Sequence, residues 1–389
     1  MTDWRSRARA MAAELAAAGH VQDPRWRGAF EETPRHLFVP RFYRDESSVV
    51  DGDNPSSHDE WLAAVYSDQS LTTQQARVPG TELMWATSSS TMPSLMARML
   101  ELLAVAEDDR VVEIGTGTGY NVALLCHRLT DTNIASIDID PTLVSAAGTR
   151  LARLGYHPHL AVGDGAAGIP ERAPFDRVIA TCAVPAIPTA WITQLHVGGV
   201  IVTDLRGEIA SSLLVLHKTS AHTVEGRFQT TAGHFIWLRP SAANPLRDGE
   251  TLAAVIDRDD AEQRVTDLDP FIVEHPDVRL MLQLLDPTLG PTWRTRRGDA
   301  ELLCLLSPDG AWAEVDTDIR GGKYAVVQGG PRRLWDEAER AGRWWEQHGR
   351  PTRDRFGLTA HADGTGHYWL DAPGQPWITF DSAGRRDPH

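Results

Sequence analysis

Residues 111–120, which read VVEIGTGTGY, decide the fold of this chain. Residues typical of a buried parallel strand run directly into Gly115, Gly117 and Gly119, and a helix can begin at about Tyr120. Glycine lets the backbone reverse sharply and lets a ligand lie against it. The amides exposed by such a turn and by the helix N-terminus suit carboxylates and phosphates equally well. The stretch therefore predicts a ligand-binding turn in an α/β fold.

The acid before the turn separates two classes of ligand. The glycines fit the dinucleotide pattern G-x-G-x-x-G only loosely, because the third glycine is missing. Glu113, two residues before Gly115, is better explained by a ligand with a cationic amino group. The pattern E-x-G-x-G-x-G over residues 113–119 resembles motif I of the S-adenosylmethionine (SAM) methyltransferases. This resemblance implies SAM as the ligand.

Further apolar runs follow the turn in an order typical of alternating strands and helices. Asp138 ends the next run, roughly 20 residues past the glycines, where an acid can hydrogen-bond a ribose diol. Either Asp138 or Asp140 would also cap the helix expected near Pro141. Asp164, in the turn after the third run, is placed to accept from an adenine amino group. The runs predict a doubly wound, Rossmann-like α/β sheet and span residues 133–140, 159–162, 175–181 and 200–202.

The composition argues against several classes of partner. Asp and Glu number 53 and Lys and Arg 38, giving a net charge of −15 that disfavours nonspecific binding to nucleic acid or to an anionic membrane. Arg294, Arg296 and Arg297 are one candidate for a local basic patch. No apolar run reaches the ~20 residues that span a bilayer, and the three cysteines lack metal-binding spacing. We therefore expect a cytoplasmic protein with reduced thiols, no metal and no membrane segment.

Residues 33–40, TPRHLFVP, are similar to the segment V-P-R-E-x-F-V-P of the protein-L-isoaspartate O-methyltransferases. The chain also differs from that family. Thr91 stands at the position of the family's active-site serine, residues 41–66 are longer and more acidic, and the chain continues well beyond the sheet. Other segments match in register and extend the resemblance over about residues 30–205: YSD at 66–68, SSTMPSLMA at 89–97, GDG at 163–165, APFD at 173–176 and TCA at 181–183.

The resemblance implies carboxyl methylation with SAM as the cofactor. A side-chain carboxylate is already ionised at pH 7, so the reaction needs in-line positioning more than a general base. We expect Thr91, with Ser89 and Ser90, to hold the second carboxylate oxygen; alternatively, these hydroxyls cap the helix expected at about Pro93. By resemblance, Glu113 lies beside the cofactor's amino group. The expected cofactor contacts are Glu113, Gly115, Thr116, Gly117, Gly119, Tyr120, Asp138 (ribose), Ile139, Asp164 (adenine) and Gly165.

From about Leu216 the pattern changes to alternating strands. We therefore expect two domains, a SAM-binding catalytic domain over residues 1–215 and a C-terminal α+β extension domain over residues 216–389. Asp309-Gly310 and Asp363-Gly364 each predict a hairpin. A helix is expected over 334–347, and strands over 213–217, 228–238, 302–306, 311–316, 356–361 and 367–371.

The extension makes the chain resemble the methyltransferases of ATP-grasp (graspetide) and lanthipeptide maturation systems. This implies methylation of an aspartate in a ribosomally synthesised, ligase-cyclised precursor peptide, with the ester then closing to aspartimide or isoaspartate. The C-terminal half would recognise that peptide. A general protein-L-isoaspartate O-methyltransferase for protein repair is the alternative, and a non-catalytic SAM-binding scaffold is a third. The sequence leaves the peptide and the oligomeric state open.

Overall fold

The computed structural model describes residues 4–78, 80–240, 258, 260–382 and 384–388. Its centre is an eleven-stranded sheet with the order β20-β19-β18-β17-β11-β10-β9-β8-β5-β6-β7. Strands β5 to β9 run parallel, and β5 lies between β6 and β8. The predicted doubly wound sheet is confirmed, and the glycine turn follows its middle strand. The parallel strands are β5 (Val111–Ile114), β6 (Ile134–Asp138), β7 (His159–Val162), β8 (Phe175–Val184) and β9 (Leu195–Arg206).

Helices cover both faces of the parallel strands, so neighbouring residues of one strand enter different cores. Val111 packs in the core that contains residues of α1, α2, α5, α6 and α7, whereas Val112 packs in the core that contains Trp191 of α8. Asp23 and Asp140 cap α2 and α7, each followed by a proline at the first helical position. The helices are α1 (Trp4–Ala17), α2 (Pro24–Glu32), α3 (Arg35–Phe38), α4 (His58–Val65), α5 (Pro93–Leu103), α6 (Tyr120–Arg128), α7 (Pro141–Ala152) and α8 (Thr189–Gln194).

A small antiparallel sheet precedes the glycine turn in the chain and has the order β2-β1-β3-β4. Its edge strand β4 ends at Ser90, directly before Thr91 and helix α5. This arrangement places the predicted catalytic hydroxyls between the small sheet and the large one. The strands are β1 (Arg41–Tyr43), β2 (Val49–Asp51), β3 (Leu71–Arg77) and β4 (Met84–Ser90).

The large sheet continues across the domain boundary expected between residues 215 and 216. That boundary falls inside β10, which pairs along its length with β9 on one side and β11 on the other. After a long insertion the chain returns, and β17 pairs with β11. Four C-terminal strands thus complete the sheet that carries the glycine turn. The antiparallel strands are β10 (Ser211–Ser220), β11 (Thr223–Phe228), β17 (Phe356–His361), β18 (Gly366–Leu370), β19 (Pro376–Phe380) and β20 (Arg386–Pro388).

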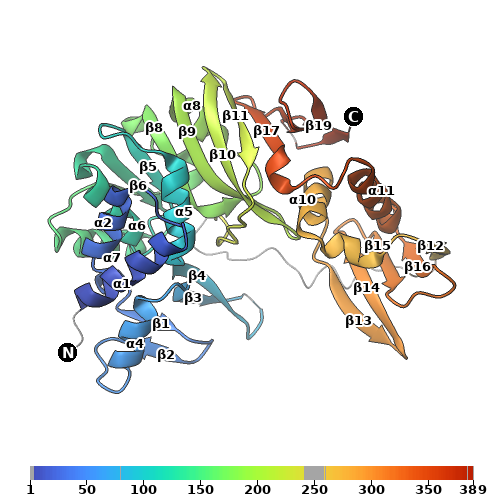
Figure 1. Ribbon diagram of the computed structural model, residues 1–389, viewed down its shortest axis with the longest axis horizontal. Helices are drawn as coiled ribbons and strands as arrows, with labels where there is room; N and C mark the ends of the chain where they lie inside the picture. Colours follow the sequence, from blue (N-terminus) through green and yellow to red (C-terminus); the bar gives the residue numbers. More distant parts are fainter. Residues whose placement is uncertain (1–3, 79, 241–257, 259, 383, 389) are drawn as a thin grey trace.

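Between β11 and β17 the chain forms a lobe, which we define as residues 262–347. A five-stranded antiparallel sheet of order β12-β16-β15-β14-β13 packs against two helices in it. Figure 1 shows this lobe, in orange and dark red, to one side of the body that carries the large sheet. The lobe consists of β12 (Glu262–Thr266), α10 (Pro276–Leu285), β13 (Trp293–Arg297), β14 (Ala300–Leu306), β15 (Trp312–Asp316), β16 (Tyr324–Gly329) and α11 (Leu334–Gln347).

The structure confirms both hairpins and the helix that the sequence predicts in the C-terminal half, whereas one of the predicted strands is wrong. Strands β14 and β15 pair across Asp309-Gly310, strands β17 and β18 pair across Asp363-Gly364, and α11 spans the expected residues. The predicted strand over residues 228–238 is wrong, because β11 ends at Phe228. Residues 235–239 instead cross to the large cavity described below. None of the described helices is long and apolar enough to cross a membrane.

Candidate active site

The turn after β5 depends on three residues with left-handed backbone. Gly115, Gly117 and Gly119 have φ values of 100°, 50° and 87°, a region that side chains disfavour. A Cβ on Gly115 would lie 2.8 Å from Oγ1 of Thr181, and one on Gly119 would lie 2.9 Å from Cβ of Ala147. The turn therefore requires glycine both for its backbone and for the close approach of its neighbours.

A cavity that is open to solvent lies against this turn and contains about 880 Å³ of empty space. It lies where the parallel strands end, which is the usual ligand position in such sheets. The end of β4, the glycine turn, the end of β6, the later part of β8 and residues 235–239 all line it. Of the residues expected at the site, those lining the cavity are Ser89, Ser90, Thr91, Glu113, Gly115, Thr116, Gly117, Tyr120, Asp138, Ile139 and Gly165.

Gly119 and Asp164 do not line the cavity. Gly119 faces Ala147 of α7 instead. The carboxylate of Asp164 accepts a hydrogen bond of 2.9 Å from the backbone N–H of Ala166, caps the short helix Gly165–Ala167, and is exposed. The adenine contact expected of Asp164 therefore stays a prediction, since the structure leaves this side chain outside the cavity.

Glu113 is a buried carboxylate at the base of the cavity, with 1% of its surface exposed. It accepts hydrogen bonds of 2.7 Å from Nδ2 of Asn121 and of 2.7 Å from the hydroxyl of Ser136. Neither neighbour carries a positive charge. Burial therefore raises the pKa of Glu113 to about 8. A cationic group of a ligand in the cavity would give the ionised form of Glu113 the positively charged neighbour that the protein does not provide.

Asp138 and Asp140 divide the two roles expected for this segment. Asp140 caps α7 by accepting 2.8 Å from the backbone N–H of Thr142, and it also accepts 2.8 Å from Nε2 of Gln74. Asp138 instead turns towards the glycine turn, where its Oδ2 accepts 2.8 Å from the backbone N–H of Gly117. Burial raises the pKa of Asp138. Asp138 is thus the acid left for the cavity.

Arg35 fixes the position of the hydroxyl segment. Its guanidinium is fully buried and donates to the backbone oxygen of Thr91 (3.0 Å) and to the hydroxyl of Ser90 (3.2 Å). It also donates to the backbone oxygens of Val65 (2.8 Å) and Gln69 (3.2 Å). Burial lowers the pKa of Arg35 to about 10, so the group stays cationic at neutral pH. One buried side chain therefore ties the hydroxyl segment to the loop after α4.

The alternative role of these hydroxyls as helix caps is wrong. Met92 is the N-cap residue of α5 and makes no side-chain capping bond. The carboxylate of Asp68 caps the helix instead, accepting 2.8 Å from the backbone N–H of Ser94.

A Cβ placed on Gly117 would lie 3.7 Å from the hydroxyl of Ser88. The end of β4 therefore faces the glycine turn across the cavity.

Residues 235–239 are the part of the site that sequence reasoning missed. Their segment is held by Asp204, which is fully buried and accepts 3.1 Å from the backbone N–H of Phe235. The hydroxyl of Ser211 donates 2.6 Å to Asp204 and accepts 2.9 Å from the backbone N–H of His234. The apolar run FIWL at 235–238 resembles a strand, so no local pattern reveals its role. Thr181 and Cys182 also line the cavity unforeseen.

The residues present fit a ligand with a cationic amino group and several hydrogen-bonding atoms. Glu113 supplies a buried carboxyl group that has only neutral hydrogen-bond partners. Within the described part of the chain, the buried Tyr120 hydroxyl and Oδ1 of Asn121 have no hydrogen-bond partner, and both residues line the cavity. Buried polar atoms of this kind usually have a partner. Among residues that the structure describes, no group of three His, Cys, Asp or Glu side chains could hold a metal.

A family model and several curated relatives match this chain. Residues 6–238 match the family model for protein-L-isoaspartate(D-aspartate) O-methyltransferase. A protein-L-isoaspartate O-methyltransferase of Xanthobacter autotrophicus is 41% identical over 157 residues, covering 40% of this chain and 69% of the relative. Its counterpart in Methanoregula boonei is 30% identical over 240 residues, covering 60% of this chain and 96% of the relative.

One solved structure matches most of the chain in fold. It is a protein-L-isoaspartate O-methyltransferase, it is 21% identical with a TM-score of 0.53, and the alignment covers 93% of this chain and 99% of that one. The alignment extends beyond residue 238, where the family model ends. The extension is therefore shared in fold and does not by itself set this chain apart.

Proposed function

Because the chain belongs to the protein-L-isoaspartate O-methyltransferase family and is a SAM-dependent carboxyl methyltransferase, we propose that it methylates isoaspartyl carboxylates in polypeptides. The relatives named above act on that group by their names. The observation that carries the proposal is that Ser89 and Thr91 line one cavity with the glycine turn and Glu113. Hydroxyl groups can hold one carboxylate oxygen by donating to it without taking its charge.

The substrate carboxylate needs no general base. A carboxyl group with a pKa near ~3.9 is ionised at neutral pH and is already a nucleophile. When bound, SAM supplies an activated methyl group whose carrier leaves as a neutral thioether. The protein therefore has to orient one carboxylate oxygen, and we assign that task to the hydroxyl of Thr91 with Ser89 beside it. Arg35 holds this segment in place through the backbone oxygen of Thr91.

Part of the wall of the cavity is apolar. Met96, Phe235 and Trp237 contribute apolar surface to it. Arg239 also lines the cavity and is the one Lys or Arg side chain among the described lining residues. A positive charge at this position favours entry of a carboxylate. Glu113 and Asp138 remain assigned to the amino group and the ribose of the cofactor.

A second candidate substrate is an ordinary aspartate in a ribosomally made, ligase-cyclised peptide. The lobe is the observation that favours this candidate. No residue of 262–347 lines the cavity, so the lobe can bind a part of the peptide other than the methylated residue. Removing all residues after 215 would not test this idea, since the cut falls inside β10 and removes strands of the central sheet. The substrates themselves provide the better test.

The deciding experiment compares three matched substrates with the full-length protein. These are a short linear isoaspartyl peptide, the same peptide with aspartate, and a side-chain-cyclised peptide with one free aspartate. We expect a methyl ester, detected by mass spectrometry, on the isoaspartyl peptide and not on its aspartyl twin. Methylation of the cyclised peptide alone would overturn the proposal in favour of the second candidate. Cofactor binding with no ester on any substrate would indicate a scaffold.

A further inference from the structure

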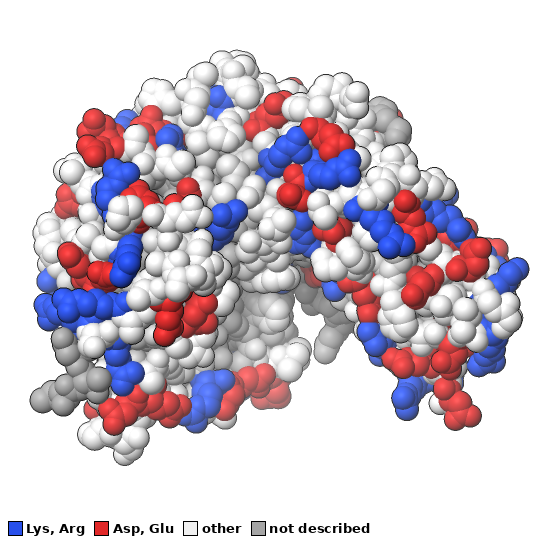
Figure 2. All heavy atoms as spheres, viewed as in Figure 1, with Lys and Arg blue, Asp and Glu red and all other residues white. Residues whose placement is uncertain are grey.

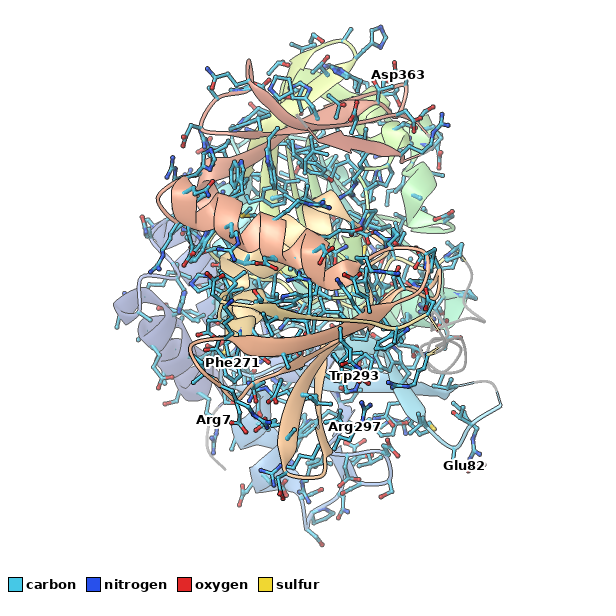
Figure 3. The ribbon with its side chains drawn as sticks, turned by 90° about the vertical axis from the view of Figure 1, so that its right-hand side faces the viewer. Arg7, Glu82, Phe271, Trp293, Arg297 and Asp363 are labelled. Carbon is cyan, nitrogen blue, oxygen red and sulfur yellow. The ribbon has the colours of Figure 1, made fainter. Side chains whose placement is uncertain are left out.

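The lobe presents an unprotected strand at the edge of its sheet. Strand β13 pairs with β14 without a bulge, and no other described strand pairs with it. All five of its residues are exposed; Trp293 keeps 40% of its surface in solvent, and Phe271, whose ring lies 4.9 Å from the guanidinium of Arg294, keeps 39%. Figure 3 shows Trp293 and Arg297 on the hairpin that projects from the lower end of the lobe. Such an edge offers backbone groups to an incoming strand.

The side chains of this edge are basic. The strand reads WRTRR, with no acid, in a chain whose acids outnumber its bases by 53 to 38. Arg294 pairs with Glu274 at 2.6 Å, and Arg297 pairs with Glu314 at 2.7 Å. The side chain of Arg296 makes no hydrogen bond or ion pair with the described part of the chain; Glu301, which lies opposite it on β14, pairs with Arg294 at 3.6 Å instead. The edge therefore presents Arg296 without an ion-pair partner of its own, on the face of the strand where Arg294 covers the exposed ring of Phe271.

This pattern disfavours a second copy of the chain as the occupant. If two β13 strands paired antiparallel about Thr295, Arg294 of each copy would lie opposite Arg296 of the other, and like charges in that position are destabilising. Nucleic acid is disfavoured by the net charge of −15. An acidic polypeptide segment in extended conformation satisfies both the backbone groups and the charge.

We propose that the edge of β13 binds an extended, acidic segment of the polypeptide substrate, at a distance from the residue that is methylated. This inference rests on the proposed function for its substrate class. Backbone pairing tolerates many sequences, while the arginines set a preference for acidic ones. Figure 2 shows a notch between the lobe and the body that carries the small sheet.

The lobe is fixed firmly enough to act as such a guide. The side chain of Gln283 in α10 fills the space above Gly207 and accepts 3.1 Å from the backbone N–H of Ile209. Arg353, which follows the lobe, donates 2.8 Å to the backbone oxygen of Pro276 in α10 and 3.2 Å to the backbone oxygen of Ser211, the residue that helps hold the segment 235–239. A segment bound at β13 therefore has a defined relation to the cavity.

The test uses synthetic peptides and the full-length protein. Each peptide carries one isoaspartyl residue, a Gly-Ser linker of varied length and a terminal segment that alternates Thr with either Glu or Lys. We expect the Glu segment to lower KM roughly threefold to tenfold relative to the Lys segment, with kcat unchanged. In Arg296→Glu this preference should vanish, while KM for a short isoaspartyl peptide without the segment stays as in the parent. Arg9→Glu, at an exposed arginine of α1, is the matched control and should keep the preference.

Direct binding separates this inference from the proposed function. A labelled Glu-Thr segment without isoaspartate should bind the parent in fluorescence anisotropy, and methylation of alternate backbone amides in that segment should weaken binding roughly tenfold. If Arg296→Glu binds it as tightly as the parent, or if amide methylation has no effect, the edge is not the docking site. Absence of ester on the short isoaspartyl peptide would refute the proposed function and leave this measurement intact. A concentration-dependent dimer lost in Arg296→Glu would overturn the proposal in favour of a second copy.

Discussion

Replacing Glu113 by glutamine tests how the cavity binds its cofactor. In the free protein the pKa of Glu113 is raised to about 8 by burial, so at pH 7 only about one tenth of the molecules carry it ionised. A cationic amino group placed beside it favours the ionised form. Binding should therefore release the remaining proton, about 0.9 per ligand. The amino group of S-adenosylhomocysteine belongs to a free amino acid and is more basic than a chain terminus, so it is already protonated at pH 7 and the net release stays at about 0.9.

Titration calorimetry measures this release. S-adenosylhomocysteine, which carries the same amino group and cannot react, is titrated at pH 7 in buffers of low and high ionisation enthalpy. The slope of the observed enthalpy against the buffer enthalpy gives the protons released. Glu113→Gln keeps the shape of the side chain and should remove the release. Affinity of the parent should also rise about tenfold from pH 7 to pH 9, once the ligand's own titration is corrected for.

Two results would refute this reasoning. A parent protein that releases no proton would mean that Glu113 is already ionised or stays protonated in the complex. An equal release in Glu113→Gln would place the proton on another group. Asp138 is the nearest alternative, because its pKa is also raised by burial, and Asp138→Asn separates the two.

The remaining predictions concern stability and turnover. The folded-state pKa of Glu113 lies above its ordinary value of 4.5. The contribution of Glu113 to stability is therefore present below about pH 4.5 and is lost as pH rises through about 8. The melting temperatures of the parent and of Glu113→Gln should diverge over that window, with the variant more stable at pH 9. Thr91→Ala should lower kcat about 10- to 100-fold without changing cofactor affinity, whereas Thr91→Ser should keep most activity; equal rates in steady-state assays would remove Thr91 from the mechanism. Gly115→Ala should weaken cofactor binding more than tenfold, because its Cβ would lie 2.8 Å from Oγ1 of Thr181, while Gly155→Ala, also at positive φ but with nothing within 4 Å, should bind normally in calorimetry. Arg35→Met should destabilise the fold by about 3 kcal/mol in urea titration, since it leaves several backbone oxygens buried without donors, and a normal unfolding midpoint would contradict the anchoring role.

Features encoded by neighbouring residues could be read from the sequence. The glycine turn, the cap of α7 by Asp140 and the Asp-Gly hairpins each depend on a few adjacent residues whose backbone preferences agree. The alternative that the hydroxyls before Pro93 cap α5 is wrong, because the residue that caps this helix is not a sequence neighbour. The carboxylate that caps this helix comes from Asp68, which is distant in sequence and gives no local signal.

The sequence by itself determined the parallel core, the glycine turn and many, but not all, of the residues that surround the turn. Only the tertiary structure decided that Asp164 lies outside the cavity, that residues 235–239 enter it, and that the strands after the lobe rejoin the central sheet. The physical reason is that hydrophobic periodicity specifies which face of a strand is buried but not which strand it pairs with. Partners separated by more than a hundred residues, such as Gly226 and Leu358, are chosen by the packing of the whole molecule.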